Sequence, residues 1–88
     1  MKGTNPEFNN FVGEWIRTYR SRQEYTIDMM SEKLLVDSRS YADQEKGKLG
    51  FSGHTLSRFL IQLPEPEVLN FVRGLKKIVW WEEFKDVE

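Results

Sequence analysis

The polar stretch between Asp37 and Lys46 holds the side chains best suited to reading another molecule through hydrogen bonds. A helix of about 10 Å diameter fits the major groove of DNA, and the exposed residues at its N-terminal end reach the base edges. If residues 37–46 form such a helix, base contacts are predicted for Ser38, Arg39, Ala42 and Asp43.

Arg39 is the strongest of these predicted contacts. A guanidinium can donate two hydrogen bonds to O6 and N7 of guanine, which is worth about 1–3 kcal/mol of discrimination between bases. Asp43 can accept a hydrogen bond from the amine of cytosine, but its charge repels phosphate. The alternative is that Arg39 is an ordinary solvated surface residue.

The residue types do not indicate catalytic or metal-binding chemistry. The chain has no cysteine, which excludes a disulfide, a thiol nucleophile and a thiolate zinc site. Its one histidine, His54, has no second histidine at a metal-ligand spacing, so a solvated or capping role is expected. No nucleophile elbow or phosphate-binding loop is present. We therefore predict no catalytic residue, metal, cofactor or small-molecule substrate.

Length and composition indicate a single globular domain that folds in water. The 88 residues are enough for a single core, and 39% hydrophobic with 31% charged residues is typical of a globular protein. No apolar run approaches the roughly 18 residues that a membrane span needs, and Met1 to Asn5 lack a signal-peptide pattern. We expect a cytoplasmic protein without membrane contact. The net charge of −1 gives no basic excess to indicate nucleic acid.

Apolar residues at helical spacing and residues that cap helix N-termini indicate helices throughout. The predicted caps are Thr26, Asp37 and Ser52, and Gly47 can end the third helix in the left-handed conformation. With their caps, the predicted helices cover residues 6–22, 26–35, 37–46, 52–63 and a last segment that opens at Pro64 and Pro66. Because no strand is needed, the predicted fold class is a compact all-α five-helix bundle.

The same spacing predicts which side chains face the core. On the second helix these are Ile27, Met30 and Leu34, and on the fourth Leu56, Phe59, Leu60 and Leu63. On the fifth they are Val68, Leu69, Val72, Leu75 and Val79. Tyr41 is expected in the core because the third helix has almost nothing else to bury.

Two short capped helices separated by Leu35 and Val36 are typical of a helix-turn-helix. From residue 11 to about residue 63 the chain resembles the XRE/Cro family of bacterial and phage repressors. The matching positions are Gly13, Ile16, Arg20, Thr26, Leu34, Val36, Glu45, Gly47, Lys48, Ser52 and Leu56. The resemblance implies a lambda-repressor-like helix-turn-helix domain over residues 1–63, followed by a C-terminal helix over residues 64–88 that packs on the core.

The resemblance also implies roles for individual residues. Arg20 and Glu45 are expected to form an ion pair that ties the first helix to the end of the third. Phosphate contacts are expected from Thr26, Ser40, Lys46 and Lys48.

The chain departs from the family pattern at four positions. Ser31 replaces an alanine and is small enough for close helix packing. Ile27 replaces a glutamine, so one phosphate contact is lost. Leu35 replaces the glycine of the turn. Either the leucine is left-handed, with a strain of about 1 kcal/mol, or the turn has another geometry. Gln44 replaces the apolar residue that anchors the third helix, at a cost of about 1–3 kcal/mol unless its amide finds partners.

The C-terminal segment has more apolar residues than one face of a helix can bury. If the helix continues, Lys77, Trp80, Phe84 and Val87 form a second stripe. A surplus apolar face indicates a partner, and a two-fold dimer is the commonest form of homo-oligomer. We therefore predict a homodimer interface at Trp80, Trp81 and Phe84. The alternative is that the two tryptophans fold back onto the first helix.

The function predicted from the sequence is a sequence-specific DNA-binding transcriptional regulator. By resemblance it is a repressor, and it binds double-stranded DNA as a homodimer with the third helix in the major groove. The alternative is a protein-interaction module that keeps the helix-turn-helix scaffold without DNA affinity. Ile27, Gln44, Asp43 and the net charge favour the second hypothesis, whereas Arg39, Lys46 and Lys48 favour the first.

Overall fold

A computed structural model describes residues 6–80, with the side chains of Val79 and Trp80 excepted. The described chain is a compact all-α globule of five helices without strands, which confirms the predicted fold class at this level. The helices are α1 (Pro6–Gln23), α2 (Ile27–Leu34), α3 (Ser38–Glu45), α4 (Gly53–Leu60) and α5 (Glu65–Leu75), and a π-helical turn, η1 (Lys76–Trp80), continues α5. No helix among these residues is long and apolar enough to span a bilayer.

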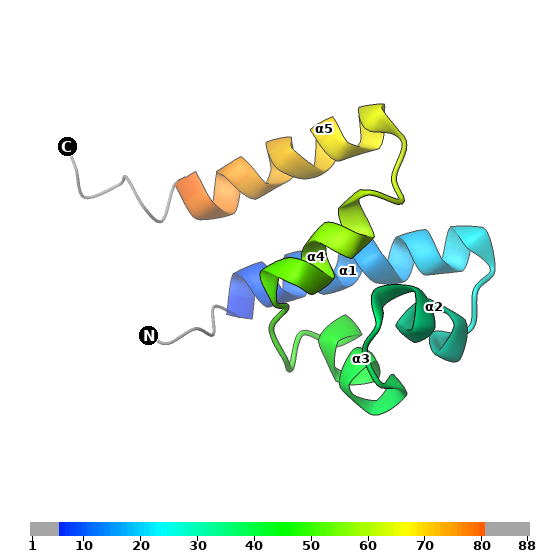
Figure 1. The fold of residues 1–88 in the computed structure, drawn as a ribbon. Coiled ribbons are helices and arrows are strands. Elements are labelled where there is room, and N and C mark those ends of the chain that lie inside the picture. Colours follow the sequence, from blue (N-terminus) through cyan, green and yellow to red (C-terminus); the bar gives the residue numbers. More distant parts are fainter. Residues whose placement is uncertain (1–5, 81–88) are drawn as a thin grey trace.

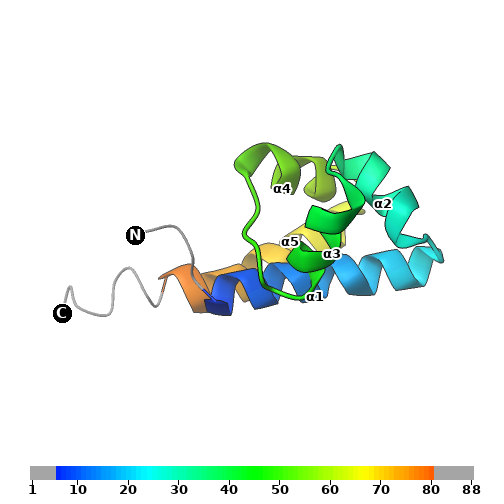
Figure 2. The same cartoon turned by 90° about the horizontal axis from the view of Figure 1, so that it is seen from below.

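The long helix α1 extends across the molecule (Figure 1). Helices α2 and α3 lie on one side of α1, and α5 lies on the other (Figures 1 and 2). Helix α3 contacts α1 and α2, and α5 contacts α1. The outer side of α3 is therefore not covered by α5.

The predicted caps are confirmed, and they explain why short helices begin where they do. The side chains of Thr26, Asp37 and Ser52 accept hydrogen bonds from the backbone N–H groups three residues later. Each bond satisfies one of the donors that a helix N-terminus leaves free. Gly47 takes a left-handed conformation with φ of 81°, as predicted for the end of α3.

The turn between α2 and α3 keeps its geometry without a glycine. Leu35 has φ of 58° and ψ of 45°, so of the two alternatives for this turn the structure has the left-handed leucine. Its N–H donates to the carbonyl of Glu32, and the N–H of Val36 donates to that of Ser31, which is the Schellman pattern. These two bonds hold Leu35 in a conformation that leucine alone disfavours.

The core sits between α1 and the other helices and is rich in aromatic rings. Tyr41, Phe59 and Phe71 are fully buried there. The ring centroids of Tyr19 and Phe59 lie 5.7 Å apart, and those of Phe59 and Phe71 lie 6.3 Å apart, both edge to face. Such ring pairs add about 0.5–1.5 kcal/mol each beyond burial, so this chain of rings ties α1, α4 and α5 into one body.

Some predicted inward faces are wrong. Leu69 is 57% exposed and Val72 is 39% exposed, whereas Phe71 and Ile78 are buried. Helix α5 is rotated so that its largest ring enters the core, since burying an aromatic ring removes more apolar surface from water than burying a valine. Ile27 is also exposed, at 37%, because it is the first residue of α2 and only the later residues of its face meet the core.

Candidate nucleic-acid interface

Three of the four predicted base-contact residues, Arg39, Ala42 and Asp43, lie on the side of α3 away from its buried residues, whereas the Ser38 hydroxyl is turned towards α2. Ser38 and Arg39 are exposed, and Ala42 and Asp43 are half-buried. The opposite side of the helix is buried through Tyr41 and Gln44. Helix α3 is thus attached along one edge and free along the other, which is the arrangement that a groove-binding helix requires.

Two hydroxyls of the predicted contact set already have partners within the chain. The Ser38 hydroxyl donates to a carboxylate oxygen of Asp28 at 2.5 Å and lies 3.3 Å from the Ser31 hydroxyl. The Ser40 hydroxyl donates to Asp37 at 3.0 Å. These serines fix α3 against α2 and close its first turn, and their oxygens remain available as acceptors.

The charges around α3 are mixed. Residues 26–48 contain four Lys or Arg and five Asp or Glu. Arg39, Lys46 and Lys48 are exposed, and none of them has an ion-pair partner among residues 6–80. Asp37 adds a stable negative charge at the start of α3, because the N–H and hydroxyl of Ser40 lower the pKa of its carboxyl group. Attraction to phosphate in this part of the chain therefore comes from these three cations and from Lys33, which is also exposed.

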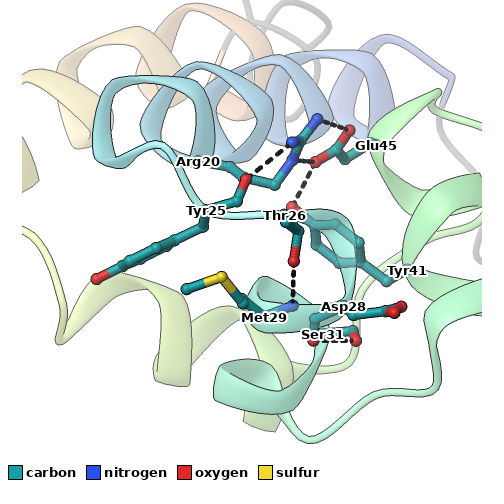
Figure 3. A network of polar contacts seen from close by, with 8 residues as sticks. All are labelled: Arg20, Tyr25, Thr26, Asp28, Met29, Ser31, Tyr41 and Glu45. Atoms are coloured by element: carbon teal, nitrogen blue, oxygen red, sulfur yellow. Dashed lines mark hydrogen bonds and ion pairs between the residues drawn. The ribbon is translucent and has the colours of Figure 1, made fainter.

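The predicted ion pair between Arg20 and Glu45 is confirmed and is part of a larger network (Figure 3). The Arg20 guanidinium reaches from α1 and donates to both carboxylate oxygens of Glu45, at 2.5 and 3.1 Å. It also donates to the backbone carbonyl of Tyr25 at 3.1 Å. The side chains of Arg20 and Glu45 are only 19% and 7% exposed. The pair therefore fixes the end of α3 to α1 in a region from which water is largely excluded.

Tyr41 completes this network, and its predicted place in the core is confirmed. Its side chain is fully buried, and its hydroxyl donates to Glu45 at 2.5 Å. Burial, followed by the hydrogen bond to the Glu45 carboxylate, raises the pKa of Tyr41 above its ordinary value. The phenol stays protonated and keeps donating. The spacing of four residues between Tyr41 and Glu45 was a signal for this contact that the sequence analysis did not use.

Gln44 is the weak point in the attachment of α3. It is buried, and its amide nitrogen donates to the carbonyl of Gly50 at 3.1 Å. Its amide oxygen is buried without a hydrogen-bond partner among the described residues. A buried acceptor without a partner costs about 1–3 kcal/mol. Only one of the two polar atoms of the Gln44 amide therefore has a hydrogen-bond partner, and part of the expected cost in stability remains.

Replacing Gln44 with leucine is expected to stabilise the protein by about 1 kcal/mol. The change removes the unpartnered oxygen and supplies an apolar side chain of similar volume. Gly50 is only half-buried, so its carbonyl can bind water instead of the Gln44 amide. Urea unfolding followed by circular dichroism measures the change. Gln62→Leu is the control, because its amide donates to the carbonyl of Arg58 in a half-buried place. A lower unfolding free energy for Gln44→Leu than for the unmodified protein would contradict this account.

Two other groups of predicted residues stand apart from α3. His54 is exposed at the start of α4, and the described residues contain no cluster of metal-ligating side chains. The predicted dimer residues Trp81 and Phe84, and the side chain of Trp80, lie outside the described residues. Their role as an interface stays a prediction.

Comparison with known proteins adds no assignment. Neither the family models, nor the curated proteins, nor the solved structures include one that matches this chain.

Proposed function

We propose that this protein is a sequence-specific DNA-binding transcriptional regulator of the lambda-repressor-like type, a repressor by its resemblance to the XRE/Cro family. Helix α2, the turn at Leu35 and helix α3 act as a helix-turn-helix, and α3 enters the major groove. The observation that carries the proposal is the placement of α3, whose inner edge is anchored by Tyr41 and Glu45 while Arg39 stands free on its outer side. Double-stranded DNA is the partner that fits such a helix.

Within this proposal the residues have separate tasks. Arg39 reads a guanine through two hydrogen bonds. Asp43 accepts a hydrogen bond from the amine of cytosine and so disfavours sequences that lack such an amine at this position. Lys46 and Lys48 lie beyond the C-terminal end of α3 and contact phosphate without reading sequence. Because the anions around α3 limit attraction to phosphate, affinity depends on correct base contacts more than on charge.

The test begins with selection of bound duplexes from a random DNA pool, followed by fluorescence anisotropy on a selected duplex and a scrambled one. Arg39→Ala is expected to reduce the preference for the selected duplex by about 1–3 kcal/mol. Lys48→Ala is expected to weaken binding to both duplexes and to flatten the slope of log affinity against log salt by about one. Arg73→Ala, which removes an exposed cation of α5 on the side of α1 opposite to α3 (Figure 1), is expected to change neither.

A second function is favoured by apolar side chains beside α3. Leu35 is 68% exposed and Met29 is 44% exposed. Exposed apolar side chains make no favourable contact with a phosphate backbone, whereas a protein partner can bury them in an interface. If the partner is a protein, the selection should enrich no duplex and the titrations should show no dependence on salt. This result would replace the DNA proposal.

A further inference from the structure

A hollow of about 450 Å³ lies between α1 and α5, whereas α3 lies on the other side of α1 (Figure 1). We call it the α1–α5 hollow. Contacts between the two helices fix its width. The Arg22 guanidinium donates to both carboxylate oxygens of Glu67, at 3.0 and 2.7 Å, and about three turns away on α1 the ring of Phe11 packs on Gly74. The hollow therefore exists before a ligand enters, and its volume is typical of small-molecule sites.

One wall of the α1–α5 hollow is aromatic. The ring of Trp15 lies edge to face with that of Phe71 at a centroid distance of 5.3 Å, and it is tilted against that of Phe11 at 6.5 Å. Trp15 is half-buried, so these contacts hold the indole in place while part of its surface lines the hollow. An indole fixed in this way is suited to stack against an aromatic ligand.

The charged groups of the α1–α5 hollow form two pairs of unequal strength. Arg22 engages both oxygens of Glu67, and this hydrogen bonding lowers the pKa of the Glu67 carboxyl group. Glu14 and Arg17 are joined only by a contact of 3.7 Å, and their side chains are 72% and 53% exposed. An exposed pair of this kind is worth little, so both groups can change partner at little cost. The hollow thus offers a ligand one acid and one base, with no net charge.

Glu14 and Arg17 also line a second hollow, which lies between α1 and the end of α3. No aromatic ring lines it, since its other lining residues are Asn10, Glu45 and Lys46. The ring of Trp15 therefore distinguishes the two hollows, and an aromatic ligand fits the one beside α5.

We propose that the α1–α5 hollow binds a free aromatic amino acid in its zwitterionic form. The ring of the ligand stacks on Trp15, its carboxylate accepts hydrogen bonds from Arg17, and its ammonium group donates to Glu14. An α-amino acid carries its two charges close together, as do two side chains three residues apart on a helix. A ligand with a net charge would be attracted by one of these side chains and repelled by the other.

Two uncharged side chains of the α1–α5 hollow add hydrogen-bonding capacity. Thr18 and Asn70 are exposed, and neither side chain has a hydrogen-bond partner among the described residues. A hydroxyl and an amide can each donate and accept, so they complement either charged group of the ligand.

The binding is expected to be weak and does not depend on DNA. At the binding energy per atom that is usual for small ligands, the roughly 12 non-hydrogen atoms of phenylalanine give a dissociation constant on the order of 1 mM. The ligand is bound and not converted, so it is not a substrate. Because the lining residues come from α1 and α5, binding is measured on the protein alone, and its failure is distinguishable from a failure to bind DNA.

Titration of the full chain with L-phenylalanine, followed by two-dimensional NMR spectra of the backbone amides, provides the first test. We expect saturating shifts that are largest for residues 14–22 and 67–70. Three analogues each lack one part of the ligand: phenylpropionate has no ammonium group, phenethylamine no carboxylate and L-alanine no ring. Each is expected to bind about tenfold more weakly. Shifts that do not saturate with phenylalanine, or equal affinity for a singly charged analogue, would overturn the proposal.

Variants of exposed residues test which group of the ligand each side chain binds. Arg17→Ala is expected to weaken binding of phenylalanine by about tenfold and to remove its advantage over phenethylamine, since the carboxylate has lost its partner. Glu14→Gln is expected to remove the advantage over phenylpropionate in the same way. Circular dichroism verifies that the variants are folded. An advantage over phenethylamine that persists in Arg17→Ala would contradict the assignment.

A pair of asparagine variants distinguishes the two hollows. Asn70→Ala is expected to weaken binding of phenylalanine, and Asn10→Ala is the matched control. Both asparagines are exposed, but Asn70 lines the α1–α5 hollow and Asn10 the second hollow. An equal or larger effect of Asn10→Ala would place the ligand beside α3 and overturn the proposal.

Discussion

Replacing Arg20 with leucine is expected to lower the unfolding free energy by about 3–5 kcal/mol. The substitution leaves the Glu45 carboxylate, whose side chain is 7% exposed, without its cationic partner. A carboxylate that loses its counter-charge in such a place keeps the cost of desolvation and loses the compensating attraction. Since domains of this size are stable by about 5–15 kcal/mol, a large share of the stability should disappear. Urea unfolding followed by circular dichroism measures the loss.

Two further variants separate the lost charge pair from other effects. Arg17→Leu also removes an arginine from α1, but Arg17 is 53% exposed and its pairing with Glu14 is a surface contact of 3.7 Å. Its effect should be small. In the double variant Arg20→Leu with Glu45→Gln, the neutral amide no longer needs a cation and its oxygen can still accept from Tyr41. The double variant should recover part of the unfolding free energy that Arg20→Leu loses. Equal stabilities for Arg20→Leu and Arg17→Leu would refute the role given to this network.

Gly13→Ala is expected to destabilise the protein by about 2 kcal/mol, although alanine is the better helix former. A Cβ atom at Gly13 would lie 2.7 Å from the carbonyl oxygens of both Gln44 and Glu45. These are backbone atoms at the end of α3, so the whole helix has to shift. An overpacking cost of about 3 kcal/mol exceeds the gain of about 1 kcal/mol in helix propensity.

Gly53→Ala is the matched control, and its effect should have the opposite sign. Gly53 is the first residue of α4, and a Cβ atom there meets nothing within 4 Å. The substitution reduces the freedom of the unfolded chain and should stabilise the protein by about 0.4–1 kcal/mol. Thermal melts of the two variants compare the effects directly. A rise in melting temperature for Gly13→Ala would show that α1 and α3 can separate without cost.

The helices and the residues at which they begin could be predicted from the amino-acid sequence alone. Thr26, Asp37 and Ser52 each satisfy a backbone donor only three residues away, so their role can be predicted from neighbouring residues alone. The exposure of the outward face of α3 also follows from its polar composition. The ion pair of Arg20 and Glu45 was available only through the family resemblance, since 25 residues separate its partners.

Which side chains are free to bind a partner depends on how the helices pack in three dimensions. The rotation that buries Phe71 and exposes Leu69, the unpartnered oxygen of Gln44 and the bond from Ser38 to Asp28 all depend on helices that meet in space. Helical periodicity gives the relative directions of side chains around one axis, but it does not fix the rotation of that axis against its neighbours. Packing sets this rotation, because the aromatic rings fill the core only in certain orientations.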